Sequence, residues 1–538
     1  PRKGEYRKEF IHRLRKREID EDLISFESLQ NKTCHRRLVK CQKIISPKFT
    51  VEEVKTVIGE LKTGKSADMT GLLREVFINA GDDLLSSITY MVNAVKETKT
   101  VPYRWEQMQI KTLKKKCGTL KNLNNHRGIF IVNILSLIFE KLLKKRISPF
   151  LENNMSKFQT GGVKGKGVND NLFILRGIVD HCNYLGKELW LTFYDIEKCF
   201  DSLWLEDCLN SLWDYGIQDD LLFLVYMLNH KAEIHIKTLV GITDPIWLND
   251  LAKQGTVLGP ILNNCSLDRI CKDGDGYQIG NVEIKSLEFV DDIADPNNGP
   301  IAALKSNAEI VRIQKEKRLK FSSKKCELLK LNNKSGDWTL KVNGLLLELV
   351  DKAKYLGDYF NVKGNNNDLI KDRVAKATGS TVELISLCKE VVFGKHQIQN
   401  MIILYKSIFV PRVIHSCEAW TNLTIHDNKL LKSAQLFYLR SIFQVSKATP
   451  IAALYLEAGV LPIEYEIQIR QLMFLKNILN KDFSDPVFLV YKEMLSFQHE
   501  KNWANNVLDL RNRYNLPLSD LNIKNMSKGD WKLLVKTL

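Results

Sequence analysis

The spacing of apolar residues at the start of the chain predicts helices. Apolar positions recur at helical spacing among charged ones over residues 5–30, which predicts a basic, solvent-exposed helix. Thr50 and Glu53 form an S/T-x-x-E capping box in front of an apolar run that starts at Val54. In such a box the two side chains satisfy backbone N–H groups of the first helical turn. We therefore expect a helix that starts at Thr50 and ends near Gly64.

The pattern changes in the middle of the chain. Short apolar segments at residues 189–193 and 287–290 alternate with helical stretches and predict strands. Asn343-Gly344 stands between alternating residues and predicts a tight hairpin, because both residue types tolerate a positive φ. From about residue 368 onward the apolar spacing is helical again. The expected fold class is α/β (α+β), a mixed centre flanked by helical segments.

Composition and charge narrow the kinds of partner. At 538 residues the chain is long enough for several packed subdomains. Lys and Arg outnumber Asp and Glu by 79 to 63, a formal net charge of +16, which favours a polyanion such as nucleic acid or an acidic membrane surface. No run of about 18 uncharged apolar residues occurs, so we expect no membrane span. The 11 cysteines are scattered without a CxxC pair, as in cytosolic or nuclear proteins with reduced thiols.

Acidic residues follow two of the predicted strands. Asp195 follows the first strand, and Asp291-Asp292 follow the second. If these strands are neighbours in a sheet, their ends bring Asp195 and Asp291 together across 291 − 195 = 96 residues of sequence. Nucleotidyl transfer needs such carboxylates, which hold two Mg²⁺ ions about 3.5–4 Å apart. An Asp-Asp pair alone is more often a solvated turn, so the hypothesis depends on the surrounding motifs.

Three motifs occur in a fixed order: residues 194–201 (YDIEKCFD), 254–260 (QGTVLGP) and 289–292 (FVDD). They closely resemble palm motifs A, B and C of reverse transcriptases, above all the LINE-type (non-LTR) retrotransposon enzymes. Other segments extend the resemblance to about residues 50–480. They are the finger motifs with Pro102, Trp105, Lys114-Lys115 and residues 125–129; residues 159–170 before the palm; motif D at residues 321–327; the primer-grip hairpin at 354–357; and a thumb with Tyr405, Pro411 and Trp420.

The resemblance implies a right-hand polymerase with fingers, a palm made of an antiparallel sheet plus helices, and a helical thumb. The expected segments are a basic N-terminal helical segment at 1–49, the fingers with an N-terminal extension at 50–187, the palm with motifs A to E at 188–365, the helical thumb at 366–480, and a basic C-terminal tail at 481–538.

The same resemblance implies a catalytic centre with Mg²⁺ as cofactor, two ions in all, which Mn²⁺ can replace. Asp195, Asp291 and the backbone carbonyl of Ile196 would be metal ligands, and Asp292 a supporting carboxylate. Lys324 or Lys325 would donate a proton to the departing pyrophosphate, and the sequence does not choose between these two lysines.

Nucleotide and primer sites are implied as well. Arg127, with Lys114 or Lys115, would hold the incoming triphosphate. Phe200 would disfavour a 2′-hydroxyl, although a core aromatic fits the local pattern equally well. Gln254 and Gly255 would lie against the template and the nascent pair, where Gly permits close approach of the backbone. The primer grip would be formed by Tyr355, Leu356 and Gly357.

The expected function is RNA-directed DNA synthesis. The chain would extend a DNA primer or target 3′-end on the element's RNA template with dNTPs, and by family it would be a nuclear and cytoplasmic ribonucleoprotein. Three departures from the family pattern, Gly128, Cys199 and Lys253, keep a second hypothesis open, a catalytically weak nucleic-acid-binding relic. A third is another palm polymerase, either an intron maturase or a viral RNA polymerase; the residues Phe-Val-Asp-Asp instead of Gly-Asp-Asp speak against the viral enzyme.

Overall fold

The computed structural model describes residues 33–114, 126–238, 241–249, 252–268, 275–390, 397–497 and 500–537. The chain divides into two compact units. The first comprises Pro1–Ser156, Ile196–Ile270 and Arg312–Lys320, and the second Lys157–Asp195, Cys271–Val311 and Phe321–Leu538. Both units contain helices and sheet strands, so the mixed α/β class is confirmed.

The first unit combines helices with a five-stranded sheet in the order β2-β1-β4-β5, in which β6 also pairs with β4. Strand β1 is antiparallel to β2 and parallel to β4. The elements of this unit are α3 (Val51–Gly59), α4 (Arg74–Ile78), α5 (Asp82–Thr98), α6 (Tyr103–Glu106), β1 (Gln107–Lys114), β2 (His126–Ile131), α7 (Ile134–Asn154), α9 (Cys199–Ser202), α10 (Leu205–Asp214), α11 (Asp220–His230), β4 (Lys231–Thr238), β5 (Gly241–Ile242), β6 (Ile246–Asn249) and α12 (Gly259–Leu267).

The capping box predicted the start of α3 correctly. Thr50 accepts a hydrogen bond from the backbone of Glu53, and the Glu53 side chain accepts one from the backbone of Thr50. The helix ends at Gly59 and not near Gly64. Leu61 is buried at 6% exposure, and its N–H bonds to the carbonyl of Ile58 in a tighter turn. Residues 33–41 are also helical, whereas the helix predicted over residues 5–30 lies outside the described residues.

The second unit contains a five-stranded sheet in the order β14-β11-β3-β10-β9, with β3 at its centre. Its elements are α8 (Val168–Leu185), β3 (Leu189–Asp195), β7 (Tyr277–Ile279), β8 (Val282–Ile284), β9 (Leu287–Phe289), β10 (Asp292–Asn297), most of α13 (Gly299–Glu316), β11 (Glu327–Leu331), β12 (Lys341–Val342), β13 (Leu345–Leu346), β14 (Glu348–Leu349), β15 (Lys352–Tyr355), β16 (Asp358–Asn361), α14 (Asn367–Glu390), α15 (Gln397–Leu404), the π-helical turn η3 (Tyr405–Phe409), α16 (Val410–Val413), the 3₁₀ turn η4 (Cys417–Ala419), α17 (Ile425–Phe443), α18 (Ile451–Ala458), α19 (Ile463–Leu479), α20 (Pro486–Ser496), α21 (Trp503–Arg513), α22 (Asp520–Asn525) and α23 (Lys528–Lys536).

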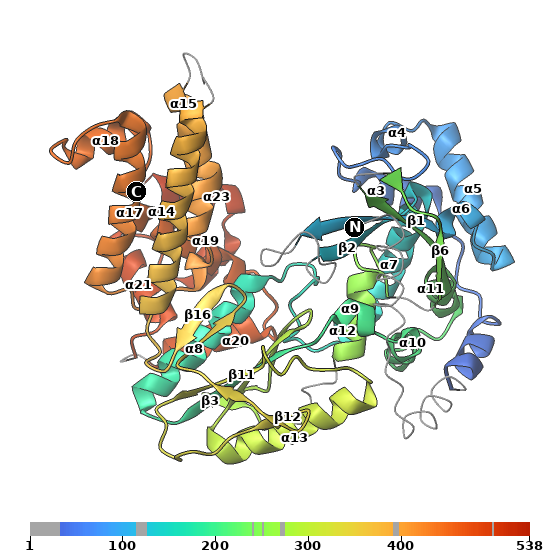
Figure 1. The fold of residues 1–538 in the computed structure, drawn as a ribbon, viewed down its shortest axis with the longest axis horizontal. Helices are drawn as coiled ribbons and strands as arrows, with labels where there is room; N and C mark the ends of the chain where they lie inside the picture. The colour runs from blue at the N-terminus through green and yellow to red at the C-terminus, as the bar shows by residue number, and fades with distance from the viewer. Residues whose placement is uncertain are drawn as a thin grey trace. The chain divides into compact units, whose positions relative to one another are not determined.

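Helices cover both faces of this sheet. On one face α13 contacts the strands, where the Tyr194 hydroxyl donates to Asn307 over 2.9 Å and Ser306 donates to Asp295 over 2.9 Å. Leu191 and Phe193 belong to the opposite face, because side chains alternate along a strand, and they join a core with α8 and the C-terminal helices. Both layers are visible around β3 and β11 in Figure 1.

The hairpin predicted at Asn343-Gly344 is confirmed. The two residues connect β12 to β13 with φ values of 52° and 78°, and Val342 pairs with Leu345. Positive φ at both central residues is the geometry that favours Asn-Gly in a two-residue hairpin.

Helices dominate the chain after residue 367, as the apolar spacing predicted. Helices α14, α17 and α19 run side by side in Figure 1, and residues of α14, α17 and the segment between them build a core of their own. Among the described residues, no helix combines the length and the apolar character that a membrane span requires.

Residues 481–538 do not form the basic tail that we expected. They contain the helices α20 to α23, and Trp503 and Trp531 are 1% and 0% exposed. Trp503 packs edge-on against Phe173 of α8 with ring centroids 5.1 Å apart. Most charged residues of this segment are exposed or half-buried, although Glu500 and Arg511 are buried, and its apolar stripes complete the core of the second unit.

Candidate active site

Asp195 and Asp292 lie directly opposite each other at one end of the central sheet of the second unit. Strands β3 and β10 are antiparallel, and their register pairs Asp292 with Asp195. Directly opposed residues of an antiparallel pair point to the same face, with Cβ atoms about 4.5–5.5 Å apart. The sheet therefore brings together two carboxylates that are 97 residues apart in sequence (292 − 195 = 97).

Asp291 occupies a different position from Asp292. It lies in the two-residue turn Val290-Asp291 between β9 and β10. The resemblance implies Asp291 as the metal ligand and Asp292 as its support, and the strand register places Asp292 opposite Asp195. The two aspartates are therefore distinct in position, and their separate substitution distinguishes their roles.

A cavity of about 250 Å³ lies at this end of the sheet, and Asp195, Asp292, Lys324, Lys325 and Tyr355 are among its lining residues. The Lys325 Nζ lies 2.8 Å from one carboxylate oxygen of Asp195 and 3.1 Å from the other. The Lys325 side chain is 66% exposed and that of Asp195 26% exposed, so solvent weakens this ion pair. Motif D thus contributes a cation directly at the Asp195 carboxylate.

The backbone of Asp195 is held by the segment that precedes β11. Ser322 donates its N–H to the carbonyl of Asp195 over 2.8 Å, and the Asp195 N–H points to the Cys326 sulfur at 3.4 Å. Burial raises the pKa of the Cys326 thiol to about 11, so the thiol stays neutral at physiological pH. Cys326 therefore positions Asp195 and contributes no thiolate.

The donor atoms fit a hard divalent cation better than a soft one. Asp195 and Asp292 offer carboxylate oxygens, which Mg²⁺ and Mn²⁺ prefer. Within the described ranges, no group of three or more His, Cys, Asp or Glu side chains forms a complete metal-ligand set. A carboxylate pair nevertheless suffices where waters and substrate phosphates complete the octahedron.

A third aspartate lies beneath this site. Asp295 of β10 is 0% exposed, and its carboxylate accepts hydrogen bonds from Ser306 and Asn297 at 2.9 and 2.8 Å. Burial raises its pKa to about 7 against the opposing effect of these hydrogen bonds. The raised pKa means that the folded state favours the protonated acid.

We therefore predict how stability changes with pH at Asp295. A carboxyl group whose folded pKa is raised stabilises the fold fully below its unfolded pKa of about 3.9, and this contribution disappears as the pH rises through about 7. Asp295→Asn does not titrate, so its stability relative to the unmodified chain should rise between pH 4 and 7, by up to about 1.4 kcal/mol per pH unit. Urea unfolding at pH 5, 6, 7 and 8 measures this difference. The exposed Asp509→Asn is the control, and a flat difference for Asp295→Asn would contradict the prediction.

The predicted primer-grip residues form a second tight hairpin, in the second unit. Leu356 and Gly357 connect β15 to β16 with φ values of 48° and 95°. Tyr355 is 3% exposed, and its hydroxyl donates to the carbonyl of Leu287 over 2.8 Å. The hairpin is thereby attached to the strand β9 that precedes Asp291.

The nucleotide-site candidates Lys114, Arg127, Gln254 and Gly255 all lie in the first unit, on or against the strands β1 and β2. Arg127 lies on β2 opposite Leu113, next to Lys114, and both basic side chains are exposed. The Gln254 carbonyl accepts the N–H of Phe130 over 3.0 Å. Lys115 lies outside the described residues.

Gly255 has a physical requirement for glycine. Its φ is 102°, and an added Cβ would meet the Ile129 side chain at 2.9 Å and the Phe130 carbonyl oxygen at 3.1 Å. Motif B therefore packs its backbone against β2, where a side chain would be both strained and crowded.

Phe200 and Ile196 also belong to the first unit. Phe200 is half-buried on α9, and the neighbouring Cys199 donates from its sulfur to Asn263 of α12 over 2.9 Å. The Cys199 departure from the family pattern is thus accommodated by a hydrogen bond. Ile196 follows Asp195 directly, and its side chain is 2% exposed.

The sequence did not single out Glu140, which organises the motif B loop. Glu140 of α7 is 3% exposed and accepts the N–H groups of Val257 and Leu258 at 2.7 and 3.3 Å. Burial lowers the pKa of Lys253 to about 8 and raises that of Glu140, and each residue's charge opposes the shift of the other. The charge of Glu140 thus accommodates the buried Lys253, which differs from the usual residue of the family at this position. In the sequence, the signal that could have drawn attention to Glu140 was an acidic residue within the mostly apolar run 134–143.

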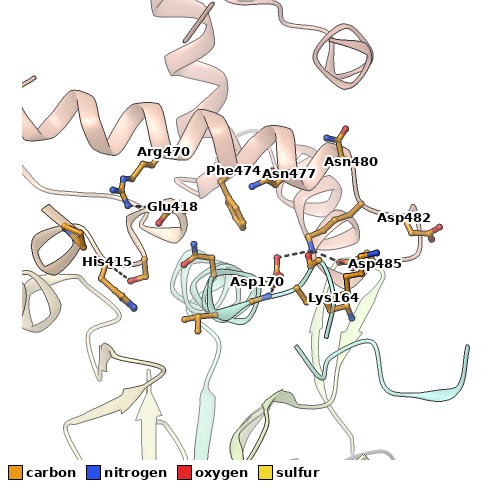
Figure 2. Close-up of a pocket in the computed structure, with 18 residues that line it drawn as sticks. Lys164, Asp170, His415, Glu418, Arg470, Phe474, Asn477, Asn480, Asp482 and Asp485 are labelled. Atoms are coloured by element: carbon orange, nitrogen blue, oxygen red, sulfur yellow. Dashed lines mark hydrogen bonds and ion pairs between the residues drawn. The ribbon is translucent and has the colours of Figure 1, made fainter. Parts of the chain in front are cut away.

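A larger cavity of about 840 Å³ lies elsewhere in the second unit, between the loop before α8 and helix α19. Figure 2 shows Phe474 and Asn477 of α19 among the residues that line this cavity. Its charges pair with one another: Lys481 lies 3.1 Å from Asp170, and Arg470 lies 3.6 Å from Glu418. Its lining contains four basic side chains and the same number of acidic ones, so the formal charge of the lining is balanced; they are Lys164, Lys166, Arg470 and Lys481, and Asp170, Glu418, Asp482 and Asp485.

Comparison with known proteins shows what the chain resembles. Residues 113–360, which contain all three motifs, match the family model of reverse transcriptase (RNA-dependent DNA polymerase). The chain is 23% identical over 308 residues to the retrovirus-related Pol polyprotein from type-1 retrotransposable element R2 of Nasonia vitripennis, an alignment that covers 53% of this chain and 29% of that protein. It is 22% identical over 220 residues to the transposon TX1 uncharacterized 149 kDa protein of Xenopus laevis, covering 41% and 17%.

The chain thus spans less than a third of the length of either relative. The matched family, the two relatives and the motif order agree with one another. Residues 113–360 therefore form a reverse transcriptase (RNA-dependent DNA polymerase) domain, and the chain that contains them is similar to proteins of non-LTR retrotransposons.

Proposed function

We propose that this chain extends a DNA primer 3′-end on the RNA of its own element, with dNTPs as substrates. One observation carries the proposal: β3, which ends in motif A, and β10, which begins at the end of motif C, are neighbours, and Asp195 and Asp292 are opposed at their ends. This is the carboxylate arrangement that nucleotidyl transfer requires. By family, the protein acts as a nuclear and cytoplasmic ribonucleoprotein.

We assign the fingers to residues 50–187, the palm to 188–365 and the thumb to 366–480. The antiparallel sheet around β3 supports the palm assignment, and the helices α14 to α19 support the thumb. The palm segment contributes residues to both compact units, because residues 196–270 belong to the first.

Asp195, Asp291 and the carbonyl of Ile196 would hold Mg²⁺, with Asp292 as a supporting carboxylate. Two such ions, when bound, activate the primer 3′-hydroxyl and neutralise the leaving pyrophosphate. The carboxylate chemistry of the site supports Mg²⁺, or Mn²⁺ in its place.

The remaining roles concern binding and orientation. Arg127, Lys114 and Lys115 would hold the triphosphate by charge-assisted hydrogen bonds. Gln254 and Gly255 would contact the template and the nascent pair, and Phe200 would exclude a 2′-hydroxyl. The tight turn of Leu356-Gly357 would present its backbone to the primer strand, with Tyr355 as its anchor.

We assign the proton donor to Lys325 in preference to Lys324, because Lys325 already lies 2.8 Å from Asp195. Lys325→Met should lower kcat for nucleotide addition by roughly a hundredfold, the usual range for loss of a general acid. Lys324→Met is the matched neighbouring control and should have a much smaller effect. Single-turnover incorporation between pH 6 and 9 tests the assignment, since loss of the acid should flatten the high-pH limb of the profile. Equal losses in both variants would refute it.

Primer extension on an RNA template with dNTPs and Mg²⁺ tests the proposed function itself. Incorporation of dNTPs supports it, and preference for rNTPs would point to an RNA polymerase. Template binding that weakens steeply with salt, without extension, would identify the nucleic-acid-binding relic.

A further inference from the structure

The turn that contains Asp291 has an unfavourable backbone conformation. Val290 precedes Asp291 and has a φ of 62°. Left-handed φ values are rare outside Gly, Asn and Asp, and a β-branched side chain is among the least tolerant of them. Such conformations persist only where the surroundings hold them, and they concentrate at functional sites.

The Gln159 side chain holds this turn. Its Oε1 accepts the N–H of Val290 over 3.0 Å and the N–H of Gly161 over 3.0 Å. Its Nε2 points to the Glu288 carboxylate at 3.4 Å. Gln159 is 0% exposed and Glu288 2% exposed, so these hydrogen bonds are made out of water, where their loss is costly.

The backbone around Gln159 attaches to the strand before the turn. Thr160 donates its N–H to the carbonyl of Glu288 over 2.9 Å, and Glu288 donates its N–H to the carbonyl of Phe158 over 3.2 Å. Asn171 of α8 donates its side-chain amide to the same Glu288 carbonyl over 2.9 Å. The segment 158–160 thus extends the sheet beside β9 and fixes where the Gln159 carboxamide lies.

Gly161 allows this close approach. A Cβ on Gly161 would lie 2.5 Å from the backbone nitrogen of Val290 and 2.5 Å from its Cγ2. No real Cβ approaches a backbone atom so closely, so the loop and the turn fit only with Gly at this position.

Residues 157–170 include the loop that holds the turn, and both ends of this segment contact the region after α19. Lys157 donates to the Ser484 hydroxyl over 2.7 Å, and Asp170 lies 3.1 Å from the Lys481 Nζ. Figure 2 shows Asp170 beside this second contact. The segment is therefore a bridge between the start of the C-terminal helices and the turn of Asp291.

We propose that Gln159 is a positioning residue for the polymerase centre, which locks Val290 in the left-handed conformation and thereby orients Asp291. This role rests on the proposed function. The family resemblance assigned Gln159 only to the segment before the palm. The contacts give its carboxamide a specific task at the motif C turn.

Gln159→Met tests the lock, because it keeps the size of the side chain and removes both of its hydrogen-bonding ends. In the full chain we expect the Val290 amide to exchange with solvent hydrogen at least about tenfold faster, since its buried acceptor is gone. Gln278→Met, an exposed glutamine of the same unit, is the matched control. Unchanged exchange at Val290 would overturn the lock, and this measurement requires no polymerase activity.

The link to catalysis is tested in the background of Val290→Gly. Glycine adopts a positive φ without steric cost, so the turn then needs no lock. Gln159→Met should lower kcat roughly tenfold or more in the unmodified chain, with the template–primer Kd unchanged, and less than about threefold in the Val290→Gly background.

Equal losses in both backgrounds would overturn the positioning role and leave Gln159 as a packing residue. The same conclusion follows if exchange at Val290 accelerates without a change in kcat. If Gln159→Met does not fold, Gln159→Asn is substituted, which keeps the amide but withdraws it from Val290. A chain that extends no primer even unmodified refutes the proposed function, whereas the exchange measurement still decides on the lock.

Discussion

Asp195→Asn should abolish primer extension, with a loss of nucleotide addition on the order of a thousandfold or more. The amide removes a charged ligand from the site where the carboxylates of β3 and β10 meet, and metal-ion stabilisation of the transition state contributes several kcal/mol at about 1.4 kcal/mol per factor of ten. Single-turnover incorporation measures the loss. The template–primer Kd, measured by fluorescence anisotropy, should stay within about threefold because the fold is unaffected.

Asp291→Asn and Asp292→Asn separate the two aspartates that follow β9. The family resemblance predicts that Asp291→Asn is as damaging as Asp195→Asn and that Asp292→Asn is milder. If Asp292→Asn proves the more damaging, the ligand is the residue paired with Asp195 across the strands. Asp509→Asn, an exposed aspartate of α21, controls for loss of a carboxylate elsewhere in the second unit.

Trp503→Ala should destabilise the second unit by about 3–5 kcal/mol, the usual cost of emptying a large buried aromatic site. The indole contacts Phe173 and Phe474, and its Nε1 donates to the Glu418 carbonyl over 2.7 Å. The substitution therefore leaves both a cavity and an unpaired acceptor. Differential scanning calorimetry measures the loss as a lower melting temperature.

Trp338→Ala is the matched control in the same unit. Its side chain is 53% exposed, so we expect a change within about 0.5 kcal/mol. Melting temperatures that fall equally in both variants would contradict the proposed contribution of the C-terminal helices to the core. Chains truncated before α20 should then fold as well as the full chain, which the buried Trp503 and Trp531 argue against.

Local physics made several elements predictable. The capping box at Thr50 and the Asn343-Gly344 turn depend on contacts within a few residues, and both were correct. The strands before Asp195 and Asp291 were recognisable as short apolar runs. The end of α3 was not, because the buried Leu61 follows the helix in a tighter turn, in which its N–H bonds to the Ile58 carbonyl.

Neither Glu140 nor Gln159 could be assigned a role from the sequence. Glu140 stands among the apolar residues of α7, and only the fold shows that it accepts two N–H groups of the motif B loop. Gln159 lies 131 residues before Val290, so nothing local connects its carboxamide to that turn (290 − 159 = 131). The aspartates were easier to find because carboxylates after a strand are recognisable by residue type.

By itself, the sequence revealed the resemblance to reverse transcriptases, the mixed fold class and the aspartates proposed for the site, because these depend on residue types and on periodicities within short windows. The tertiary structure alone decided that Asp292 is the residue opposite Asp195 and that the last helices complete the core. It also decided that Lys325, and not Lys324, forms the ion pair with Asp195. Strand register, side-chain contacts and core packing depend on how distant segments meet. The sequence of one strand alone does not indicate which residue, more than 90 positions away, it pairs with.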